Sequence, residues 1–288
     1  MQIKKILEED KVTISMEVFP PKKEDNLESV EAAACKIAEL KPAFMSVTYG
    51  AAGTTRGYTL EVAKKIMDDT AVPVLPHLTS IASSKADVDD MLSGMKEAGI
   101  NNIMALRGDP PKDGIVKDDF KYASDLVAYI RSGEFGKNLS VGGACYPEGH
   151  VESANKKEDL KYLKEKVDAG VDFLTTQMFF DNNAFYNFLY RAREAGITVP
   201  VLAGIMPITA ARQLGRSVAL SGTMVPPRFS AIVDHFGTSD EAMKQAGIIY
   251  ASEQIIDLMA NGIKHIHVYS MNKPDVAAGI LDNLMKLL

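Results

Sequence analysis

Charged and hydrogen-bonding side chains stand where several short apolar runs of this sequence end. Arg107, Gly108 and Asp109 follow Leu106 directly, and Glu17 lies near the end of VTISMEVF. Two carboxylates in unlike environments can divide the roles of proton donor and charge stabiliser, and a guanidinium can hold an anion. Arg107 and Asp109 could equally pair with each other in solvent. Other runs end in Thr48 and Tyr49, His77, Tyr146 with Glu148 and His150, Gln177, and Tyr269 with Asn272.

These chemical groups favour a planar heteroaromatic cofactor over a metal ion or a covalent nucleophile. His265 and His267 share one face of a predicted strand and resemble a metal pair, but no third ligand stands at useful spacing, so no metal site is predicted. The sequence has no GxxxxGK[ST], HExxH or GxSxG motif. Glu17 lies between Met16 and Val18, and we expect burial in this apolar strand to raise its pKa and keep it protonated near neutrality.

Eight β-rich runs alternate with helical patterns, which predicts a single (β/α)₈ TIM-type barrel over residues 1–288. The predicted helices include 27–40, 88–99, 159–170 and 184–196, and about three more fall within 209–262, before the last strand. An open doubly wound sheet is disfavoured, because VFPPKKED after the first run contains no glycine for a dinucleotide-binding turn. The predicted strands are 12–19, 43–50, 72–79, 102–108, 140–147, 173–180, 199–207 and 265–272.

A weak internal repeat supports the alternation of strands and helices. EAGI (97–100), DAGV (168–171), EAGI (194–197) and ANGI (260–263) each place a glycine after a helical pattern and before the next strand. Glycine ends a helix at low cost in the left-handed conformation, so each segment predicts a helix-to-strand joint. In such a barrel, the polar groups at the carboxyl ends of the strands gather at one rim, where barrel enzymes carry their chemistry.

The composition is that of an ordinary globular protein. Of the 288 residues, 46% are hydrophobic and 24% charged, and the net charge of −6 disfavours nucleic acid as a partner. Two cysteines predict neither a disulfide framework nor a zinc site. The sequence begins without a signal-peptide pattern and contains no apolar run long enough to cross a membrane, so we expect a cytoplasmic protein.

Several motifs, in order along the chain, resemble methylenetetrahydrofolate reductase, the flavoprotein family of one-carbon metabolism. They are MEVFPPKK, SVTYGAAGTTR, PHLT, NIMALRGDPP, YASDLV, ACYPEGH, DAG followed by TTQMFFD, and GIMPI. The resemblance implies ping-pong hydride transfer through FAD from NADH, or NADPH, to methylenetetrahydrofolate, giving 5-methyltetrahydrofolate. It covers the chain from about residue 12 to the C-terminus and fits the compact catalytic form of the family.

The resemblance also assigns residues to the cofactor and the substrate. Glu17 would be the general acid, Asp109 would stabilise the iminium cation of the folate, and Thr48 would lie beside flavin N5. Gln177, Gln213 and Lys273 would bind the folate. The remaining cofactor-binding residues would be Tyr49, His77, Arg107, Gly108, Asp109 itself, Tyr122, Ala144, Tyr146, His150, Asp159 and Lys166.

Four positions depart from the pattern of the family. Ser217 stands where some members stack an aromatic residue on the nicotinamide donor, and Lys273 replaces an arginine. Tyr162 and Glu165 replace polar or basic residues on the FAD-binding helix. The electron donor is therefore open between NADH, NADPH and a partner protein. An alternative function is a folate- or flavin-binding subunit of a larger reductase complex with a partner-supplied donor, and self-association is expected by resemblance.

Overall fold

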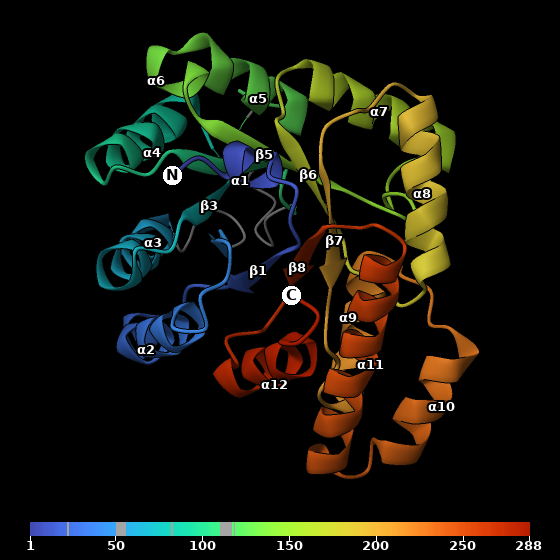
Figure 1. Cartoon of the computed structure of the whole chain (residues 1–288). Coiled ribbons are helices and arrows are strands. Elements are labelled where there is room, and N and C mark those ends of the chain that lie inside the picture. Colours follow the sequence, from blue (N-terminus) through green and yellow to red (C-terminus); the bar gives the residue numbers. More distant parts are fainter. Residues whose placement is uncertain (22, 50–55, 82, 110–116, 118) are drawn as a thin grey trace.

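Eight parallel strands close into a barrel in sequence order, β1 to β8, which confirms the predicted fold (Figure 1). The computed structural model describes residues 1–21, 23–49, 56–81, 83–109, 117 and 119–288. Gly50, at the end of the predicted strand 43–50, lies outside the described residues. The strands are β1 (Thr13–Val18), β2 (Met45–Val47), β3 (Val74–Thr79), β4 (Asn102–Leu106), β5 (Ser140–Cys145), β6 (Phe173–Thr176), β7 (Val201–Ile205) and β8 (His265–Val268).

Helices surround the barrel, and three of them occupy the insertion predicted before the last strand. These three are α9 (Ala211–Ser221), α10 (Pro227–Phe236) and α11 (Asp240–Ala260), which gather on one side of the molecule (Figure 1). The others are α1 (Ile3–Leu7), α2 (Leu27–Ala38), α3 (Arg56–Thr70), α4 (Lys85–Glu97), α5 (Ala123–Ser132), α6 (Glu134–Lys137), α7 (Lys156–Asp168), α8 (Asn182–Glu194) and α12 (Pro274–Leu284), with a short 3₁₀ turn, η1 (Glu24–Asn26). No helix in the described ranges has the length and apolarity needed to span a bilayer.

Three of the predicted helices begin two or three residues earlier than expected because each has an N-terminal cap. The side chains of Ser84, Asn155 and Asp181 accept hydrogen bonds from backbone N–H groups in the first turns of α4, α7 and α8. Such caps satisfy donors that have no partner within the helix. The predicted glycine joints are confirmed: Gly99, Gly170, Gly196 and Gly262 have φ values of 69°, 121°, 77° and 80°.

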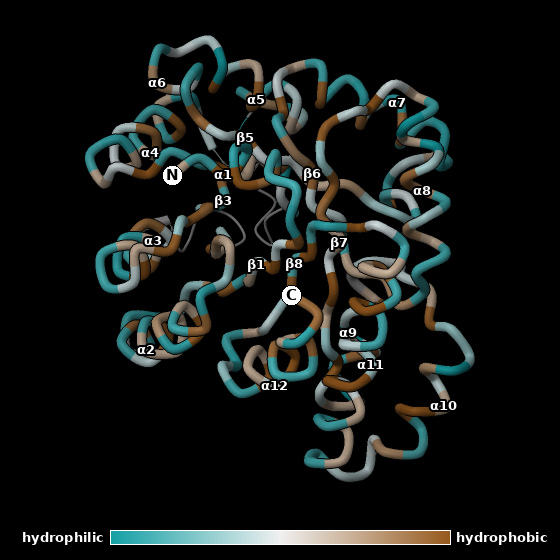
Figure 2. The backbone as a smooth tube through the Cα atoms, viewed as in Figure 1, coloured by the Kyte–Doolittle hydropathy of each residue, from teal (hydrophilic) through white to brown (hydrophobic). Residues whose placement is uncertain are grey.

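Apolar side chains between the strands and the outer helices form the main core. Ile14, Met16 and Val18 of β1 are buried in the same cluster as Ile37 of α2 and Ile280 of α12. Hydrophobic and hydrophilic segments alternate along the outer helices, which matches helices with one face on the barrel and one in solvent (Figure 2). Because strand side chains alternate between two faces, the residues between Ile14, Met16 and Val18 point into the barrel.

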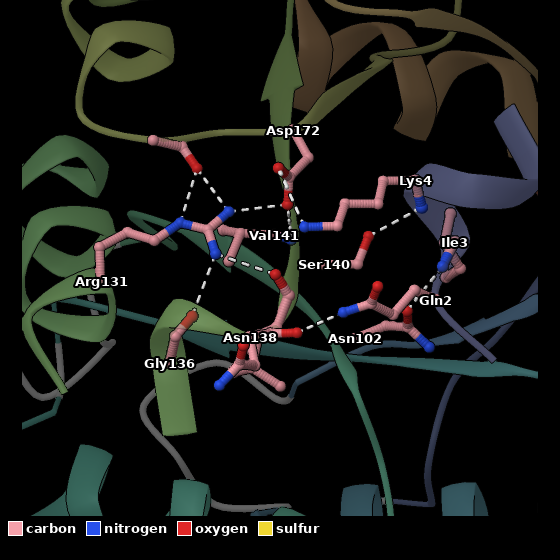
Figure 3. Close-up of polar contacts among 12 residues, drawn as sticks. Gln2, Ile3, Lys4, Asn102, Arg131, Gly136, Asn138, Ser140, Val141 and Asp172 are labelled. Atoms are coloured by element: carbon pink, nitrogen blue, oxygen red, sulfur yellow. Dashed lines mark hydrogen bonds and ion pairs between the residues drawn. The ribbon is translucent and has the colours of Figure 1, made fainter. Parts of the chain in front are cut away.

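A short N-terminal helix, α1, closes the end of the barrel opposite the predicted site. Ile3, Ile6 and Leu7 are buried with Phe44 and with Leu75, Met104, Phe173 and Leu202 of the barrel interior. Backbone N–H groups of α1 donate to Asn102 Oδ1 (2.8 Å, from Ile3) and Ser140 Oγ (2.9 Å, from Lys4), as Figure 3 shows. The sequence patterns did not predict this helix, because five residues are too few for a periodic signal.

Asp172 and Arg131 join the loops at the same end of the barrel (Figure 3). Asp172 Oδ2 accepts hydrogen bonds from Val141 N at 2.8 Å and from Arg131 Nη2 at 2.7 Å. The guanidinium of Arg131 also donates to the carbonyl oxygens of Gly136, Leu139 and Gly170. The polar groups at this end of the barrel are thus engaged in structural hydrogen bonds, so we look for the functional site at the opposite rim.

Candidate active site

A cavity of about 1010 Å³ opens at the carboxyl ends of the strands. This volume is at the upper end of the range for small-molecule sites, so the cavity has room for a large cofactor and part of a substrate. Among the residues predicted for the site, those that line it are Glu17, Thr48, Tyr49, His77, Arg107, Gly108, Asp109, Tyr122, Ala144, Tyr146, His150, Asp159, Lys166 and Gln177. Gln213 and Lys273 are not among its lining residues in the described part of the chain.

Glu17 lies in a polar cluster at the floor of the cavity. Its Oε2 atom accepts a hydrogen bond from Ser46 Oγ at 2.9 Å and lies 3.5 Å from Nε2 of both His77 and His267. His267 Nδ1 is 2.8 Å from Ser15 Oγ, and its Nε2 is 3.3 Å from Ser46 Oγ. A hydrogen-bonded path therefore runs from the carboxylate through Ser46 to His267 and on to Ser15.

The alternation of β1 explains why Glu17 has polar neighbours. Ile14, Met16 and Val18 pack outward against the helices, whereas Ser15 and Glu17 face into the barrel. The expectation that Glu17 is surrounded by an apolar strand is therefore wrong, because the apolar residues beside it in sequence point to the other face.

The predicted direction of the Glu17 pKa is wrong for the same reason. Burial raises the pKa of Glu17, but the His267 and Ser46 hydrogen bonds and the nearby imidazoles of His77 and His267 outweigh it, so the pKa lies below its usual value. Burial also lowers the pKa of His77 against the opposing effect of Glu17, which keeps this imidazole neutral near pH 7. Since a neutral His77 exerts little charge, the hydrogen bonds from Ser46 and His267 account best for an ionised Glu17.

Arg107 and Asp109 do not pair with each other. The guanidinium of Arg107 instead holds Glu152 with two hydrogen bonds, Nη1 to Oε2 at 2.6 Å and Nη2 to Oε1 at 2.7 Å. Asp109 is exposed at the rim of the cavity. Its negative charge is close enough to Arg107 to help raise the pKa of the guanidinium. Gly108 separates the two with a φ of 82°, and a Cβ atom there would meet the Thr79 side chain at 2.7 Å. Only glycine fits this turn, which directs Arg107 and Asp109 to different partners.

Strand β5 and helix α7 form a second wall of the cavity. The ring of Tyr146 meets that of His150 edge to face, with centroids 4.6 Å apart, and burial raises the pKa of Tyr146 to about 12. Lys166 Nζ donates to the carbonyl oxygen of Ala144, and burial lowers the pKa of this lysine. Asp159 accepts a hydrogen bond from Ser153 Oγ at 3.0 Å. These residues place a cation, a phenol and a carboxylate along one side.

The three residues predicted to bind folate lie at two places. Gln177 lines the cavity, and its Oε1 accepts a hydrogen bond from Met178 N at 2.9 Å. Gln213 and Lys273 meet through Thr209, which donates to Gln213 Oε1 (3.3 Å, from Oγ1) and accepts from Lys273 Nζ (2.6 Å). Lys273 thus supplies a positive charge beside the ends of β7 and β8.

Comparison with known proteins gives the family of this chain. The family model described as methylenetetrahydrofolate reductase matches residues 2–285. The chain belongs to the methylenetetrahydrofolate reductase family. It is 34% identical to 5,10-methylenetetrahydrofolate reductase of Pectobacterium carotovorum subsp. carotovorum, over 95% of this chain and 90% of that protein.

Relatives from plants are longer than this chain. Methylenetetrahydrofolate reductase (NADH) 1 of Arabidopsis thaliana is 36% identical over 98% of this chain and 50% of its own length. The chain therefore spans about half the length of the plant methylenetetrahydrofolate reductases that it matches. A solved structure of an uncharacterised protein from Clostridium thermocellum, which binds two copies of 5-methyl-5,6,7,8-tetrahydrofolic acid, has a TM-score of 0.67 over all of both chains. Its sequence identity is 14%, so the likeness concerns the fold.

Three of the residues that depart from the methylenetetrahydrofolate reductase pattern lie at or next to the cavity. Ser217 is buried on α9, and its Oγ lies 3.5 Å from Sδ of Met206, which lines the cavity. Tyr162 and Glu165 lie on α7, and both line the cavity. Glu165 thus brings negative charge to a wall where a basic residue was expected from the family.

Sequence reasoning missed the layer of residues below the rim. Three residues of this layer lie two positions before a predicted rim residue, and side chains two positions apart on a strand point to the same face. The pairs are Ser15 with Glu17, Ser46 with Thr48, and His267 with Tyr269. That spacing could have identified them. His265 and His267, which resemble a metal pair in the sequence, contact hydroxyl groups in the structure: His265 Nδ1 lies 2.9 Å from Thr13 Oγ1, and His267 Nδ1 lies 2.8 Å from Ser15 Oγ. Glu152 carried no sequence signal, because loop residues have no periodic partner.

Proposed function

We propose that this chain reduces methylenetetrahydrofolate to 5-methyltetrahydrofolate with bound FAD, and that NADH is its electron donor. Family membership supports the reaction. The observation that carries the proposal is the meeting of Glu17, His77 and His267 at the floor of a cavity whose rim bears Arg107 and Asp109.

The residues that line the cavity fit a flavin dinucleotide. Arg107 and Lys166 offer positive charge for a pyrophosphate, and the guanidinium matches it with a two-pronged set of donors. Thr48, Tyr146 and His150 supply hydroxyl and imidazole groups for a flavin and its ribityl chain. Glycine at position 108 lets the backbone turn sharply beside Arg107. Bound FAD would accept two electrons from a nicotinamide dinucleotide and deliver them to the folate.

Glu17 would supply the proton that the folate needs. Opening the methylene bridge to an iminium cation requires protonation of the departing nitrogen, and a positioned carboxylic acid can provide it. Glu17 is ionised before substrate binds, so it must first gain a proton. A folate that covers the cavity floor would exclude water and raise the Glu17 pKa, while Ser46 and His267 offer a path for the proton.

Asp109 would stabilise the positive charge that forms on the folate. Its carboxylate lies exposed at the rim of the cavity, and a negative charge placed beside the folate there favours the cation. Gln177 would orient the pterin through its side-chain amide. Lys273, held by Thr209, would attract the acidic tail of the folate.

The names of the plant relatives support NADH as the electron donor. Ser217 provides no aromatic ring to stack on the nicotinamide, which some family members have at this position. Stopped-flow absorbance separates the candidate donors. The purified protein, loaded with FAD under anaerobic conditions, is mixed with NADH, NADPH or a reduced ferredoxin, and bleaching near 450 nm is followed. We expect NADH to bleach the flavin faster than NADPH.

Addition of methylenetetrahydrofolate to the reduced protein then tests the reaction itself. We expect the flavin absorbance to return as the folate is reduced. A protein that holds flavin but does not reoxidise it with folate would instead be a binding subunit of a larger complex. A protein that holds no flavin would overturn the proposal.

A further inference from the structure

The loop that follows β8 at the rim contains two consecutive residues in the left-handed backbone conformation. Met271 and Asn272 have φ values of 55° and 54°. Glycine adopts this conformation most readily, and asparagine tolerates it better than most other residues. Met271 is 37% exposed, so packing does not account for the turn. A strained turn without glycine at the edge of a site points to a use for a side chain in it, and the contacts of Asn272 show that use.

The side-chain amide of Asn272 binds the backbone of Phe19 at two points. Its Oδ1 accepts a hydrogen bond from Phe19 N at 2.9 Å, and its Nδ2 donates to Phe19 O at 2.8 Å. Ser270, a buried residue of the same loop, donates from its Oγ to Glu17 O at 2.8 Å. Side chains of the β8 loop therefore hold the backbone of the segment that carries Glu17. Glycine at position 272 would adopt the turn at lower cost but would lose both bonds to Phe19.

These side chains continue the connection between β1 and β8 beyond the point where the two backbones pair. β1 and β8 are neighbours in the barrel, and their ladder ends at Met16 of β1 (Figure 1). On the other side of β1, pairing with β2 extends to Val18, and Thr48 N donates to Val18 O at 3.0 Å. The end of β1 is thus held by backbone bonds on its β2 side and by the side chains of Ser270 and Asn272 on its β8 side.

The position of the Glu17 carboxylate depends on the position of this backbone. Its Oε2 accepts a hydrogen bond from Ser46 Oγ at 2.9 Å and lies 3.5 Å from Nε2 of both His77 and His267. A shift of the β1 end by about 1 Å would distort these contacts and move the carboxyl group relative to a bound substrate. Misplacement of a reacting group by about this distance can slow a reaction by about a hundredfold.

We propose that Asn272 is a positioning residue for the reaction: by binding Phe19 at two points, it holds Glu17 where the carboxyl group can protonate the folate. The inference rests on the proposed function, since it assumes that Glu17 is the general acid. Reduction of the flavin by NADH requires no proton from Glu17. Loss of the Asn272 amide should therefore affect the folate half of the reaction and spare the flavin half.

Anaerobic stopped-flow absorbance of the FAD-loaded protein measures the two half-reactions in Asn272→Gly. We expect flavin reduction by NADH within about twofold of the parent, but folate reduction at saturating methylenetetrahydrofolate slower by about 10- to 100-fold. Asn272→Asp is a second, isosteric variant. It keeps an acceptor for Phe19 N but cannot donate to Phe19 O, so it should also slow folate reduction selectively. The control is Asn261→Gly, in the joint before β8, where the side chain donates to Asp257 O at 2.8 Å; it should match the parent within about twofold.

A double-mutant cycle with Glu17→Gln distinguishes positioning of Glu17 from a merely structural role. In the Glu17→Gln protein, Asn272→Gly should slow folate reduction further by less than about threefold, because the group that Asn272 positions can no longer donate a proton. The same cycle with Asn272→Asp repeats the measurement if Asn272→Gly does not fold.

Several results would overturn the role of Asn272 while leaving the proposed function intact. These are unchanged folate reduction in both Asn272 variants, equal slowing in the presence and absence of Glu17, and equal slowing of both half-reactions. Weaker folate binding without slower reduction at saturation would also overturn it, and would assign the effect to Lys273, the next residue in the chain. If methylenetetrahydrofolate does not reoxidise the flavin of the parent protein, the proposed function itself fails and the role of Asn272 fails with it.

Discussion

His267 Nε2 lies 3.5 Å from Glu17 Oε2, although 250 residues separate them along the chain. The pairing of β1 with β8, which closes the barrel, brings them together: Ser15 is in register with His267. Both residues face the barrel interior, so the environment of the carboxylate depends on barrel closure rather than on local sequence. A substitution on either strand can therefore alter the protonation of the site.

Replacing the carboxylate of Glu17 should separate the two halves of the reaction. In Glu17→Gln, we expect reduction of the bound flavin by NADH within about twofold of the parent, but folate reduction slower by about a thousandfold, because an amide cannot donate the proton. Stopped-flow absorbance measures each half-reaction separately. Glu97→Gln, at the exposed end of α4, is the control. Folate reduction within tenfold of the parent would contradict the role of Glu17 as general acid.

The low pKa of Glu17 predicts proton uptake when folate binds. The carboxylate is ionised in the free site and must be protonated to act, so about one proton per folate should enter the protein near pH 7.5. Calorimetric titration in two buffers of different ionisation enthalpy measures this number. Glu17→Gln should take up no proton. If the parent also binds folate without proton uptake, folate binding does not change the protonation of Glu17 and the proposed protonation step is wrong.

The neutral state of His77 predicts a loss of stability in mild acid. Its pKa is lowered in the folded protein, so the unfolded chain binds a proton more readily once the pH falls below about 6.5. The free energy of unfolding, measured by urea denaturation, should therefore decrease from pH 7.5 to 5.5. His77→Asn should flatten this dependence, whereas His235→Asn, exposed on α10, should not. Parallel slopes in His77→Asn and the parent would assign the acid sensitivity to other groups.

The strand periodicity, the glycine joints and the polar strand ends were sufficient to predict the barrel and most of the cavity lining. Each of these signals is local, and the parallel closure of eight strands converts it into a shared rim. The contacts of Glu17 were not predictable in this way, because Ser46 and His267 reach it from other strands. The error in the Glu17 pKa arose from reading sequence neighbours as spatial neighbours.

Strand lengths were the least accurate part of the fold prediction. The run 173–180 forms a strand only over Phe173–Thr176, and Met178, Phe179 and Phe180 are buried in the loop that follows. An apolar run cannot reveal where pairing stops when the loop beyond the strand is itself covered by α10 and α11. Phe229 and Tyr250, from these two helices, pack in the same cluster as Phe180.

The ion pair between Arg107 and Glu152 predicts that Glu152 opposes cofactor binding. A pyrophosphate must replace the carboxylate on the guanidinium, so Glu152→Gln should bind FAD about two- to fivefold more tightly, in line with the small net value of a partly exposed ion pair. Arg107→Gln should weaken FAD binding by about tenfold or more. Fluorescence titration of the apoprotein measures both, with Glu134→Gln as an exposed control. Weaker FAD binding in Glu152→Gln would mean that Glu152 assists the cofactor instead.

Asp172 lies at the end of the barrel opposite the cavity, and we predict that its replacement lowers the stability of the fold without affecting the cavity. Its carboxylate accepts hydrogen bonds from Val141 N and Arg131 Nη2, and the Arg131 and Asp172 side chains are 18% and 22% exposed. Asp172→Ala leaves a mostly buried guanidinium and a backbone N–H without this acceptor, so the free energy of unfolding should fall by about 2–4 kcal/mol in urea titrations. Asp168→Ala removes an exposed ion pair with Lys164 and should cost less than about 1 kcal/mol.

Flavin affinity provides the second measurement for Asp172→Ala. Because Asp172 is not among the lining residues of the cavity and lies with the α1 contacts at the closed end of the barrel, FAD binding by the folded variant should match that of the parent (Figure 3). Barrel enzymes separate stability and chemistry between the two ends of the strands in this way. An equal loss of stability in Asp168→Ala and Asp172→Ala, or a tenfold change in FAD affinity in Asp172→Ala alone, would show that this separation does not hold in the present chain.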